Sequence, residues 1–360
     1  MKKQILYFII FTLFLFNQKA VLADPLIIDF VGFVGRYTSM TIVNSNPAIS
    51  YYDVVNGDLK YVRASNAGGT LWNTPVTIDA GGFVGRATSM TIVNGNPAIS
   101  YYDGTNADLK YVRASNANGT LWNAPITIDS VGFAGQSTSL TIVNGNPAIS
   151  YYDATYRDLK YVRASNFSGT LWNAPVIVDA VGFVGWHSSI AMVNGNPAIS
   201  YYGSSSGDLK YVRAFNAAGT LWNTPVTIDS VGDVGLYTSI AMVNGNPAIS
   251  YYDATYRDLK YVRASNANGT LWNAPVTIDS VGFTGQYTSM TIVNGNPAIS
   301  YYDYTNADLK YVRAYDANGT SWINAASIPT LSEWGMIIMS VLLVLTAIIH
   351  IRRQDNMKKC

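Results

Sequence analysis

Arginine is the chemically versatile residue that recurs most regularly in this chain. One arginine ends the segment "DLKYVR" in each of six copies, always 50 residues from the next. These are Arg63, Arg113, Arg163, Arg213, Arg263 and Arg313. Copies related by a repeat cannot readily converge on one substrate atom. We therefore interpret them as strand residues that pair with aspartate or stack on tyrosine.

Carboxylates suited to acid–base catalysis are scarce. A glycosidase normally needs two carboxyl groups, one of them held protonated. The single glutamate, Glu333, lies after the repeats. We therefore predict that the chain is not an enzyme. The alternative is a degenerate glycosidase or lyase that acts on polysaccharide with aspartate and tyrosine residues.

Paired aspartates recur around one loop of the repeat. Asp53 and Asp58 bracket this loop in the first copy, and the fourth copy replaces the first aspartate with Gly203. Two acids in a loop could hold Ca²⁺ with help from carbonyl groups. Aspartate also caps turns by accepting hydrogen bonds from nearby backbone N–H groups. We favour capping and predict no cofactor, with Ca²⁺ at the Asp53/Asp58-type loops as the alternative.

Other bulk features exclude several classes of function. The only histidines are His187 and His350, and neither belongs to a cluster with cysteine or carboxylates, so we expect neither a zinc site nor a Ser-His-Asp centre. The formal net charge of +1 gives no reason to expect a nucleic-acid partner. Cys360 is the sole cysteine, so no disulfide can form within the chain.

The repeat that carries these residues predicts an all-β fold. The segment "NPAISYY" starts at residues 46, 96, 146, 196, 246 and 296. One unit contains four strand candidates, residues 88–93, 97–103, 108–114 and 121–129, rich in β-branched and aromatic residues. The dipeptide Asn94-Gly95 between the first two indicates a tight hairpin.

Four antiparallel strands in a 50-residue repeat are typical of a β-propeller blade. We predict six blades, with seven as the alternative. The segment "PLIID", residues 25–29, resembles "PVTID", residues 75–79, whereas the fourth strand of the last copy is degraded. We therefore expect the N-terminal strand to complete the last blade and close the ring, which removes exposed edges.

Variation among the copies separates two faces of the expected ring. The loop between the second and third strands reads VVNG, GTNA, ATYR, SSSG, ATYR and YTNA, and the inter-blade segment also varies, whereas the remaining turns are nearly constant. Both variable segments should emerge on one face, where we expect a carbohydrate or protein partner to bind. Alternatively, some of the aromatic residues plug the mouth of the ring. The candidate binding residues are Arg36, Tyr37, Arg86, Tyr156, Arg157, Trp186, His187, Tyr237, Tyr256, Arg257 and Tyr287.

The turn between the third and fourth strands resembles the Asp-box of sialidase-type propellers. In "SNAGGTLW", Ser65, Gly69 and Trp72 match that motif, whereas Ala67 and Leu71 replace its acid and threonine. The resemblance implies a structural role in which the tryptophan pins the turn, and it does not imply catalysis.

Both ends of the chain carry targeting features. Residues 1–23 have the basic start, apolar run and small-residue end of a signal peptide, although an uncleaved anchor is the alternative. Residues 334–351 are long and apolar enough for a transmembrane helix, and the basic residues after it predict a cytoplasmic tail.

The segment before that helix closely resembles the IPTL-CTERM sorting signal of Gram-negative bacteria. The matching residues are Ile328, Pro329, Thr330, Leu331, Ser332, Glu333, Trp334 and Gly335. The resemblance implies recognition by an exosortase-type transpeptidase and delivery to the cell surface; a permanent single-pass anchor is the alternative.

These features predict three domains: a signal peptide (1–23), a propeller (24–327) and a sorting segment (328–360). We expect an exported surface protein that binds extracellular carbohydrate or a protein partner without catalysis. A purely structural surface or biofilm-matrix role is a further alternative.

Overall fold

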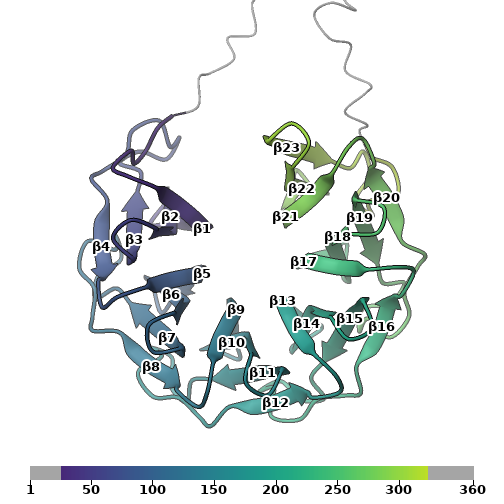
Figure 1. Cartoon of the computed structure of the whole chain (residues 1–360), viewed down its shortest axis with the longest axis horizontal. Coiled ribbons are helices and arrows are strands. Elements are labelled where there is room, and N and C mark those ends of the chain that lie inside the picture. The colour runs from purple at the N-terminus through teal and green to yellow at the C-terminus, as the bar shows by residue number, and fades with distance from the viewer. Residues whose placement is uncertain (1–25, 323–360) are drawn as a thin grey trace, which may run out of the picture.

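The computed structural model describes residues 26–322, which form an all-β, six-bladed β-propeller of antiparallel sheets (Figure 1). Blade 1 contains β1 (Val34–Val43), β2 (Asn46–Asp53), β3 (Asp58–Arg63) and β4 (Val76–Asp79). Blade 2 contains β5 (Val84–Val93), β6 (Asn96–Asp103), β7 (Asp108–Arg113) and β8 (Ile126–Asp129). Blade 3 contains β9 (Ala134–Val143), β10 (Asn146–Asp153), β11 (Asp158–Arg163) and β12 (Val176–Asp179).

The second half of the ring repeats the same plan. Blade 4 contains β13 (Val184–Val193), β14 (Asn196–Gly203), β15 (Asp208–Arg213) and β16 (Val226–Asp229). Blade 5 contains β17 (Val234–Val243), β18 (Asn246–Asp253), β19 (Asp258–Arg263) and β20 (Val276–Asp279). Blade 6 contains β21 (Thr284–Val293), β22 (Asn296–Asp303) and β23 (Asp308–Arg313). Among residues 26–322 there is no helix that could span a membrane, and the predicted signal peptide and segment 334–351 lie outside them.

The predicted hairpin turn is present in each blade. Asn94 and Gly95 both have positive φ angles, 45° and 79°, as a type I′ turn requires. In blade 1 the second position is Ser45, with φ of 66°. The turn fixes the register of β5 and β6, which pair from Val93 with Asn96 onwards.

The core lies between blades, where the back of one sheet packs on the front of the next. At the junction of blades 1 and 2, Leu59 and Tyr61 from β3 join Met90 and Tyr101 from blade 2 in one buried cluster. The ring of Trp122 meets Tyr61 edge-on with 5.1 Å between centroids. The same cluster recurs at the four following junctions, so each blade depends on its neighbours for burial.

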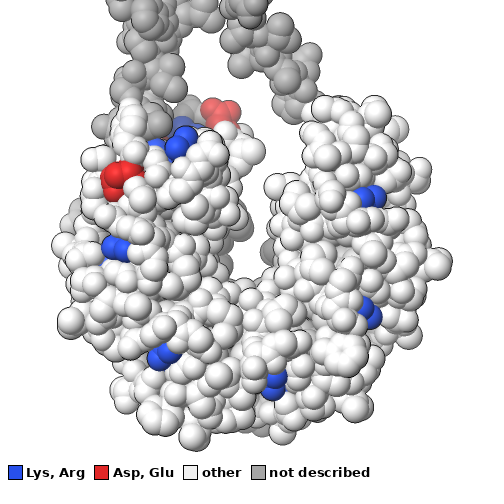
Figure 2. Space-filling view, turned by 180° about the vertical axis from the view of Figure 1, so that it is seen from behind, with Lys and Arg blue, Asp and Glu red and all other residues white. Residues whose placement is uncertain are grey.

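The two ends of the ring do not meet, which corrects one sequence-based expectation. In the described part of the chain, β23 pairs only with β22, and residues 26–29 form no strand with it. Instead, Asp29 accepts a hydrogen bond from Tyr51 at 2.6 Å, as Asp79 does from Tyr101. The segment thus lies against blade 1, where the fourth strand of a preceding blade would lie, while β23 lies across a gap (Figures 1 and 2).

Side-chain exposure marks both sides of this gap. Met40 on blade 1 is 68% exposed, whereas its counterpart Met90 is 6% exposed. Leu309 on blade 6 is 83% exposed, whereas its counterpart Leu259 is fully buried. The gap therefore leaves open the apolar faces that the five internal junctions bury.

The variable loops lie together on one face. The inter-blade loop contacts the second-to-third-strand loops of both neighbouring blades, because Val84 N–H donates to Gly57 O at 2.8 Å and Gly104 N–H donates to Phe83 O at 2.7 Å. We call the side formed by the loops 54–57 and 80–83 and their counterparts the variable face.

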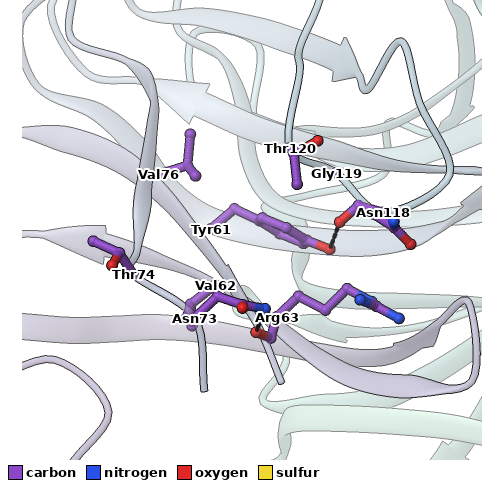
Figure 3. A pocket seen from close by; sticks show the side chains of 9 residues that line it. All are labelled: Tyr61, Val62, Arg63, Asn73, Thr74, Val76, Asn118, Gly119 and Thr120. Carbon is purple, nitrogen blue, oxygen red and sulfur yellow. Dashed lines mark hydrogen bonds between the residues drawn. The ribbon is translucent and has the colours of Figure 1, made fainter. Parts of the chain in front are cut away.

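The opposite side, formed by the turns at 44–45 and 65–72 and their counterparts, is the constant face. There, the Tyr61 hydroxyl donates to Asn118 O of the next blade at 3.1 Å (Figure 3). Arg63 donates from Nε to Val43 O at 2.8 Å and from Nη2 to Asn44 O at 2.7 Å. The repeated arginines therefore bind turn carbonyl groups, and the expected aspartate or tyrosine partner is wrong.

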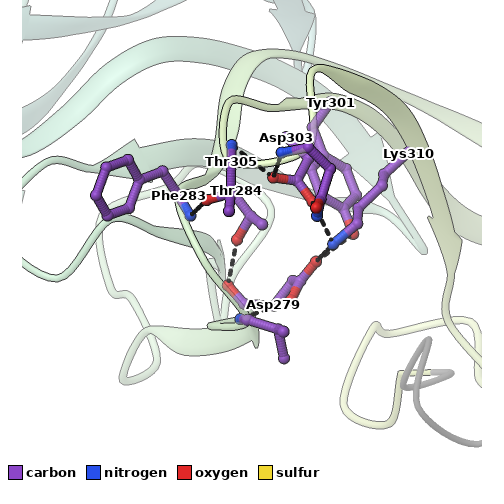
Figure 4. Close-up of polar contacts among 9 residues, drawn as sticks. Asp279, Phe283, Thr284, Tyr301, Asp303, Thr305 and Lys310 are labelled. Carbon is purple, nitrogen blue, oxygen red and sulfur yellow. Dashed lines mark hydrogen bonds and ion pairs between the residues drawn. The ribbon is translucent and has the colours of Figure 1, made fainter.

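A buried polar contact ties neighbouring blades near the variable face. In the last junction, Asp279 accepts from the Tyr301 hydroxyl at 2.8 Å and pairs with Lys310 Nζ at 3.1 Å (Figure 4). Lys310 also pairs with Asp303 at 2.9 Å. Burial, together with the Asp279 carboxylate, raises the pKa of Tyr301, so this hydroxyl remains a donor. The contact recurs around the ring, although Gly203 removes one carboxylate in blade 4.

Candidate ligand-binding site at the mouth of the ring

The innermost strand of each blade carries a bulge that orients the candidate residues. We expected Arg36 and Tyr37 in the inter-blade loop, but the structure places them inside β1, because pairing continues back to Val34 around the bulge. Tyr37 has a φ of 53°, and the equivalent His187, Tyr237 and Tyr287 have 54°, 54° and 53°. Bulky residues seldom adopt this left-handed conformation, and such strain often accompanies function.

Each bulge is held by the next blade. The hydroxyl of Thr238 donates to His187 O at 2.9 Å, and the hydroxyl of Thr288 donates to Tyr237 O at 2.8 Å. Thr88 binds Tyr37 O in the same way at 2.7 Å. The direction of the bulge side chains is therefore fixed by the packing of the blades.

The bulges of blades 4 to 6 bring aromatic rings together. The His187 and Tyr237 ring centroids are 4.2 Å apart, and those of Tyr237 and Tyr287 are 4.3 Å apart. The Trp186 ring centroid lies 6.0 Å from that of His187 and 4.8 Å from that of Tyr152. We call Trp186, His187, Tyr237 and Tyr287 the aromatic bank.

The equivalent positions in blades 2 and 3 are different, whereas blade 1 keeps an aromatic residue, Tyr37. Ala87 and Ser137 replace the rings in blades 2 and 3. Arg36 and Arg86 are exposed, and the Arg86 guanidinium carbon lies 5.7 Å from the Tyr52 ring centroid. The mouth thus combines aromatic rings with small and polar groups, the usual composition of a site that fixes a ligand by stacking and hydrogen bonds.

His187 and Tyr237 of the aromatic bank are uncharged at neutral pH. Burial lowers the pKa of His187 to about 4, so its imidazole is neutral. Burial, with a smaller effect from Tyr287, raises the pKa of Tyr237 above its usual value. Neutral rings with hydroxyl and imidazole groups can stack on a sugar and exchange hydrogen bonds with it.

The remaining candidates lie on the same face but outside the aromatic bank. Arg157 packs over Phe183 at 3.9 Å from the ring centroid, and Arg257 packs over Phe283 at 3.8 Å. Tyr156 and Tyr256 are exposed beside these arginines at 58% and 62%.

Sequence comparison among the copies missed some aromatic residues near the candidates. Phe183, Phe283 and Tyr152 stand at positions that scarcely vary, so variation could not single them out. Only the bulge and the loop geometry bring them beside varied residues.

The acidic loops fit turn capping better than a metal site. Asp53 accepts from the N–H groups of Val55 and Asn56 at 3.1 Å each, and its other oxygen lies 3.0 Å from Lys60 Nζ. Although burial opposes ionisation, the contacts with Asn56 and Lys60 hold the pKa of Asp53 below its usual value. No group of three or more potential metal ligands occurs within residues 26–322. With this carboxylate engaged and Asp58 its only acidic neighbour across the hairpin, the loop does not fit Ca²⁺.

The Asp-box-like turn has the expected structural role. Trp72 donates from Nε1 to Gly69 O at 2.7 Å, and the Ser65 hydroxyl donates to Leu71 O at 3.2 Å. Asn66 Oδ1 accepts from Thr70 N–H at 3.0 Å. An asparagine amide thus closes the turn without the missing acid.

Comparisons with known proteins agree with both resemblances. Residues 326–354 match the family described as the IPTL-CTERM motif, which confirms the sorting signal at the C-terminus. No curated protein sequence matches the chain.

Solved structures with this fold include two sialidase-like proteins. The subtype N10 neuraminidase-like protein of A/little yellow-shouldered bat/Guatemala/060/2010 has a TM-score of 0.51 at 10% identity, over 77% of this chain and 91% of that one. The Hadza microbial sialidase Hz136 has a TM-score of 0.53 at 15% identity, over 82% and 67%. At such low identity the likeness shows the propeller fold alone.

Proposed function

We propose that this chain is a surface-sorted propeller that binds extracellular carbohydrate through the aromatic bank and does not cleave it. Stacking on Trp186, Tyr237 and Tyr287 would provide most of the affinity. Arg36 and Arg86 across the mouth would bind hydroxyl or carboxylate groups. The sialidase-like neighbours support a carbohydrate as the ligand class.

One observation carries the non-catalytic part of the proposal. The six innermost strands, β1, β5, β9, β13, β17 and β21, contain no aspartate or glutamate. Glycoside hydrolysis normally requires two carboxyl groups within about 10 Å of each other at the scissile bond. The innermost strands would therefore offer a sugar over the aromatic bank rings, hydroxyls and guanidinium groups but no acid–base pair.

The sorting motif supports a location at the cell surface. Export by residues 1–23, a spanning helix at 334–351 and processing by an exosortase-type transpeptidase near Ile328 would complete this route. The propeller, residues 24–327, would then act outside the cytoplasm.

The test is a glycan-array screen of the full-length chain and of the double variant Trp186→Gln/His187→Ser. This change gives blade 4 the bulge sequence of blade 3, Gln136-Ser137, so the fold should be retained. Truncation of aromatic anchors costs about 2 kcal/mol or more. We therefore expect the affinity for the best neutral oligosaccharide to fall at least about 10-fold.

Phe167→Ala is the matched control, because Phe167 is an exposed aromatic residue on the constant face with alanine at the equivalent position in blades 1 and 2. It should leave binding unchanged. Equal binding by both variants would contradict a site at the mouth. Release of shorter sugars from the bound ligand would favour the glycosidase or lyase alternative, and the absence of any glycan ligand would favour a protein partner or a structural role.

A further inference from the structure

A pocket lies on the constant face, on the side of the ring opposite the variable loops. Between blades 1 and 2 it has a volume of about 210 Å³. Arg63 and Asn118 lie on one side of it, Thr74 on the other, and Tyr61 between them (Figure 3). This volume is below the roughly 300 Å³ at which drug-sized sites begin, so it suits a single small polar unit.

The lining of the pocket recurs at every internal junction. Equivalents of Tyr61, Arg63, Asn73 and Thr120 are identical at the four other junctions. The supporting bonds recur as well: Tyr111, Tyr161, Tyr211 and Tyr261 each donate to a carbonyl group of the next blade. The ring therefore presents five closely similar sets of lining groups.

The charge of the lining indicates an acidic ligand. The Arg63 guanidinium has five N–H donors, of which two bind carbonyl groups. Within residues 26–322 every ion pair is made by lysine, so the arginine has no carboxylate partner there. The face seen in Figure 2 shows basic groups spaced around the ring and acidic groups gathered only at one end.

The other lining groups are neutral and suit hydroxyls. Asn73 is exposed and anchored by its Nδ2, which donates to Arg63 O at 2.7 Å. Asn118 is held by Asn44, whose Nδ2 donates to Asn118 Oδ1 at 2.7 Å. Thr74 and Thr120 add exposed hydroxyl groups. One cation among amides and hydroxyls matches a sugar ring that carries one carboxylate.

Two lining positions differ between junctions. The position of Thr74 is threonine again at Thr224 but alanine at Ala124, Ala174 and Ala274. The position of Asn118 is asparagine at Asn268 and Asn318, but serine at Ser168 and alanine at Ala218. The junctions of blades 1 and 2 and of blades 4 and 5 thus have the fullest set of polar groups.

We propose that these pockets bind uronic-acid units of an acidic polysaccharide, one unit in each pocket, and most tightly at the two junctions that have both threonine and asparagine. Several weak sites on one face would bind a polymer with repeated units much more tightly than a single unit. This site is separate from the aromatic bank, so either proposal can fail without the other.

The tryptophan indole N–H signals allow each pocket to be followed by NMR. Trp122 and Trp272 donate to Gly119 O and Gly269 O, which belong to the two richest pockets. During titration of the full-length chain with sodium glucuronate, these two signals should shift at the lowest concentrations. Trp172, Trp222 and Trp322 should respond later. The pocket beside Trp322 is weakened because its Thr320 hydroxyl donates to the Asp316 carboxylate at 2.9 Å. Trp72, which borders no internal junction, should not shift.

The double variant Thr74→Ala/Thr224→Ala should raise the midpoints of Trp122 and Trp272 about two- to ten-fold, because each site loses one hydrogen bond. Thr127→Ala, an exposed residue of β8, is the control and should change nothing. Glucose should bind at least about ten-fold more weakly, since it lacks the charge-assisted contact. Equal response to glucose or to inorganic phosphate, a shift of all six signals together, or no shift at all would overturn the proposal.

Discussion

Gly235→Ala is expected to destabilise the fold by about 2–5 kcal/mol, the sum of a left-handed backbone penalty and overpacking. Gly235 opens the innermost strand of blade 5 with φ of 100°, and an added Cβ would lie 2.6 Å from Leu209 Cα of blade 4. Because that neighbour is backbone, no side-chain rotation can relieve the clash. Urea unfolding followed by tryptophan fluorescence measures the loss.

Gly245→Ala is the matched control in the same blade. Gly245 has φ of 79°, but its added Cβ would meet nothing within 4 Å. Only the backbone penalty applies, so we expect a loss of about 1–2 kcal/mol. If both variants lose the same stability, the close contact of adjacent blades at Gly235 is not what requires glycine there.

Lys160→Met should lower the free energy of unfolding by a comparable amount. The Lys160 ammonium lies 2.6 Å from Asp153 and 3.3 Å from Asp129, with side chains 10%, 0% and 3% exposed. Removing one partner of a buried ion pair costs about 3–5 kcal/mol, because the remaining charge is left uncompensated. The same urea unfolding measurement applies.

Lys210→Met is the matched control, because Lys210 occupies in blade 4 the position of Lys160 in blade 3. Blade 4 has Gly203 where the others have aspartate, so among residues 26–322 Lys210 forms its one ion pair with Asp179, at 3.4 Å. Asp179 also keeps a hydrogen bond from Tyr201 at 2.6 Å. We expect a loss of about 1–3 kcal/mol, the cost of one weakened polar contact. A loss as large as that of Lys160→Met would show that the doubly paired carboxylate is not the cause.

The regular features of the fold could be predicted from the sequence. The repeat length of 50 residues and the Asn-Gly dipeptides predicted six antiparallel blades with tight hairpin turns. The structure confirms the blades and the turns. Variation among the copies separated two faces correctly, because the chain reverses direction with each strand. The sorting motif was also evident, since its signal lies in contiguous residues.

Contacts between blades could not be predicted from the repeat pattern. Lys60 contacts Asp29, 31 residues earlier in the chain, and the Tyr61 hydroxyl donates to the carbonyl of Asn118, 57 residues later. Neither spacing is distinctive when every residue recurs in each copy. The resemblance of residues 25–29 to a fourth strand led us to expect pairing with the last blade, which the structure does not show. The resemblance could not show whether β23 lies close enough to pair.

The bulge in the innermost strand of each blade could not be predicted from the sequence either. Tyr37, Ala87 and Ser137 share one left-handed conformation although their side chains differ in every respect. The conformation is set by hydroxyl groups of the next blade, which no local pattern reveals. The sequence therefore singled out the four residues of the aromatic bank, but it could not show that their rings lie against one another.

The central claim is that the mouth of the ring binds extracellular carbohydrate through the aromatic bank and does not cleave it. The most direct measurement is a crystal structure of the chain with the best neutral oligosaccharide from the array. Sugar rings packed on Tyr237 and Trp186, with the glycosidic bonds intact, are the predicted result. The same ligand bound elsewhere with the aromatic bank empty, or found as cleaved fragments at the mouth, would contradict the account.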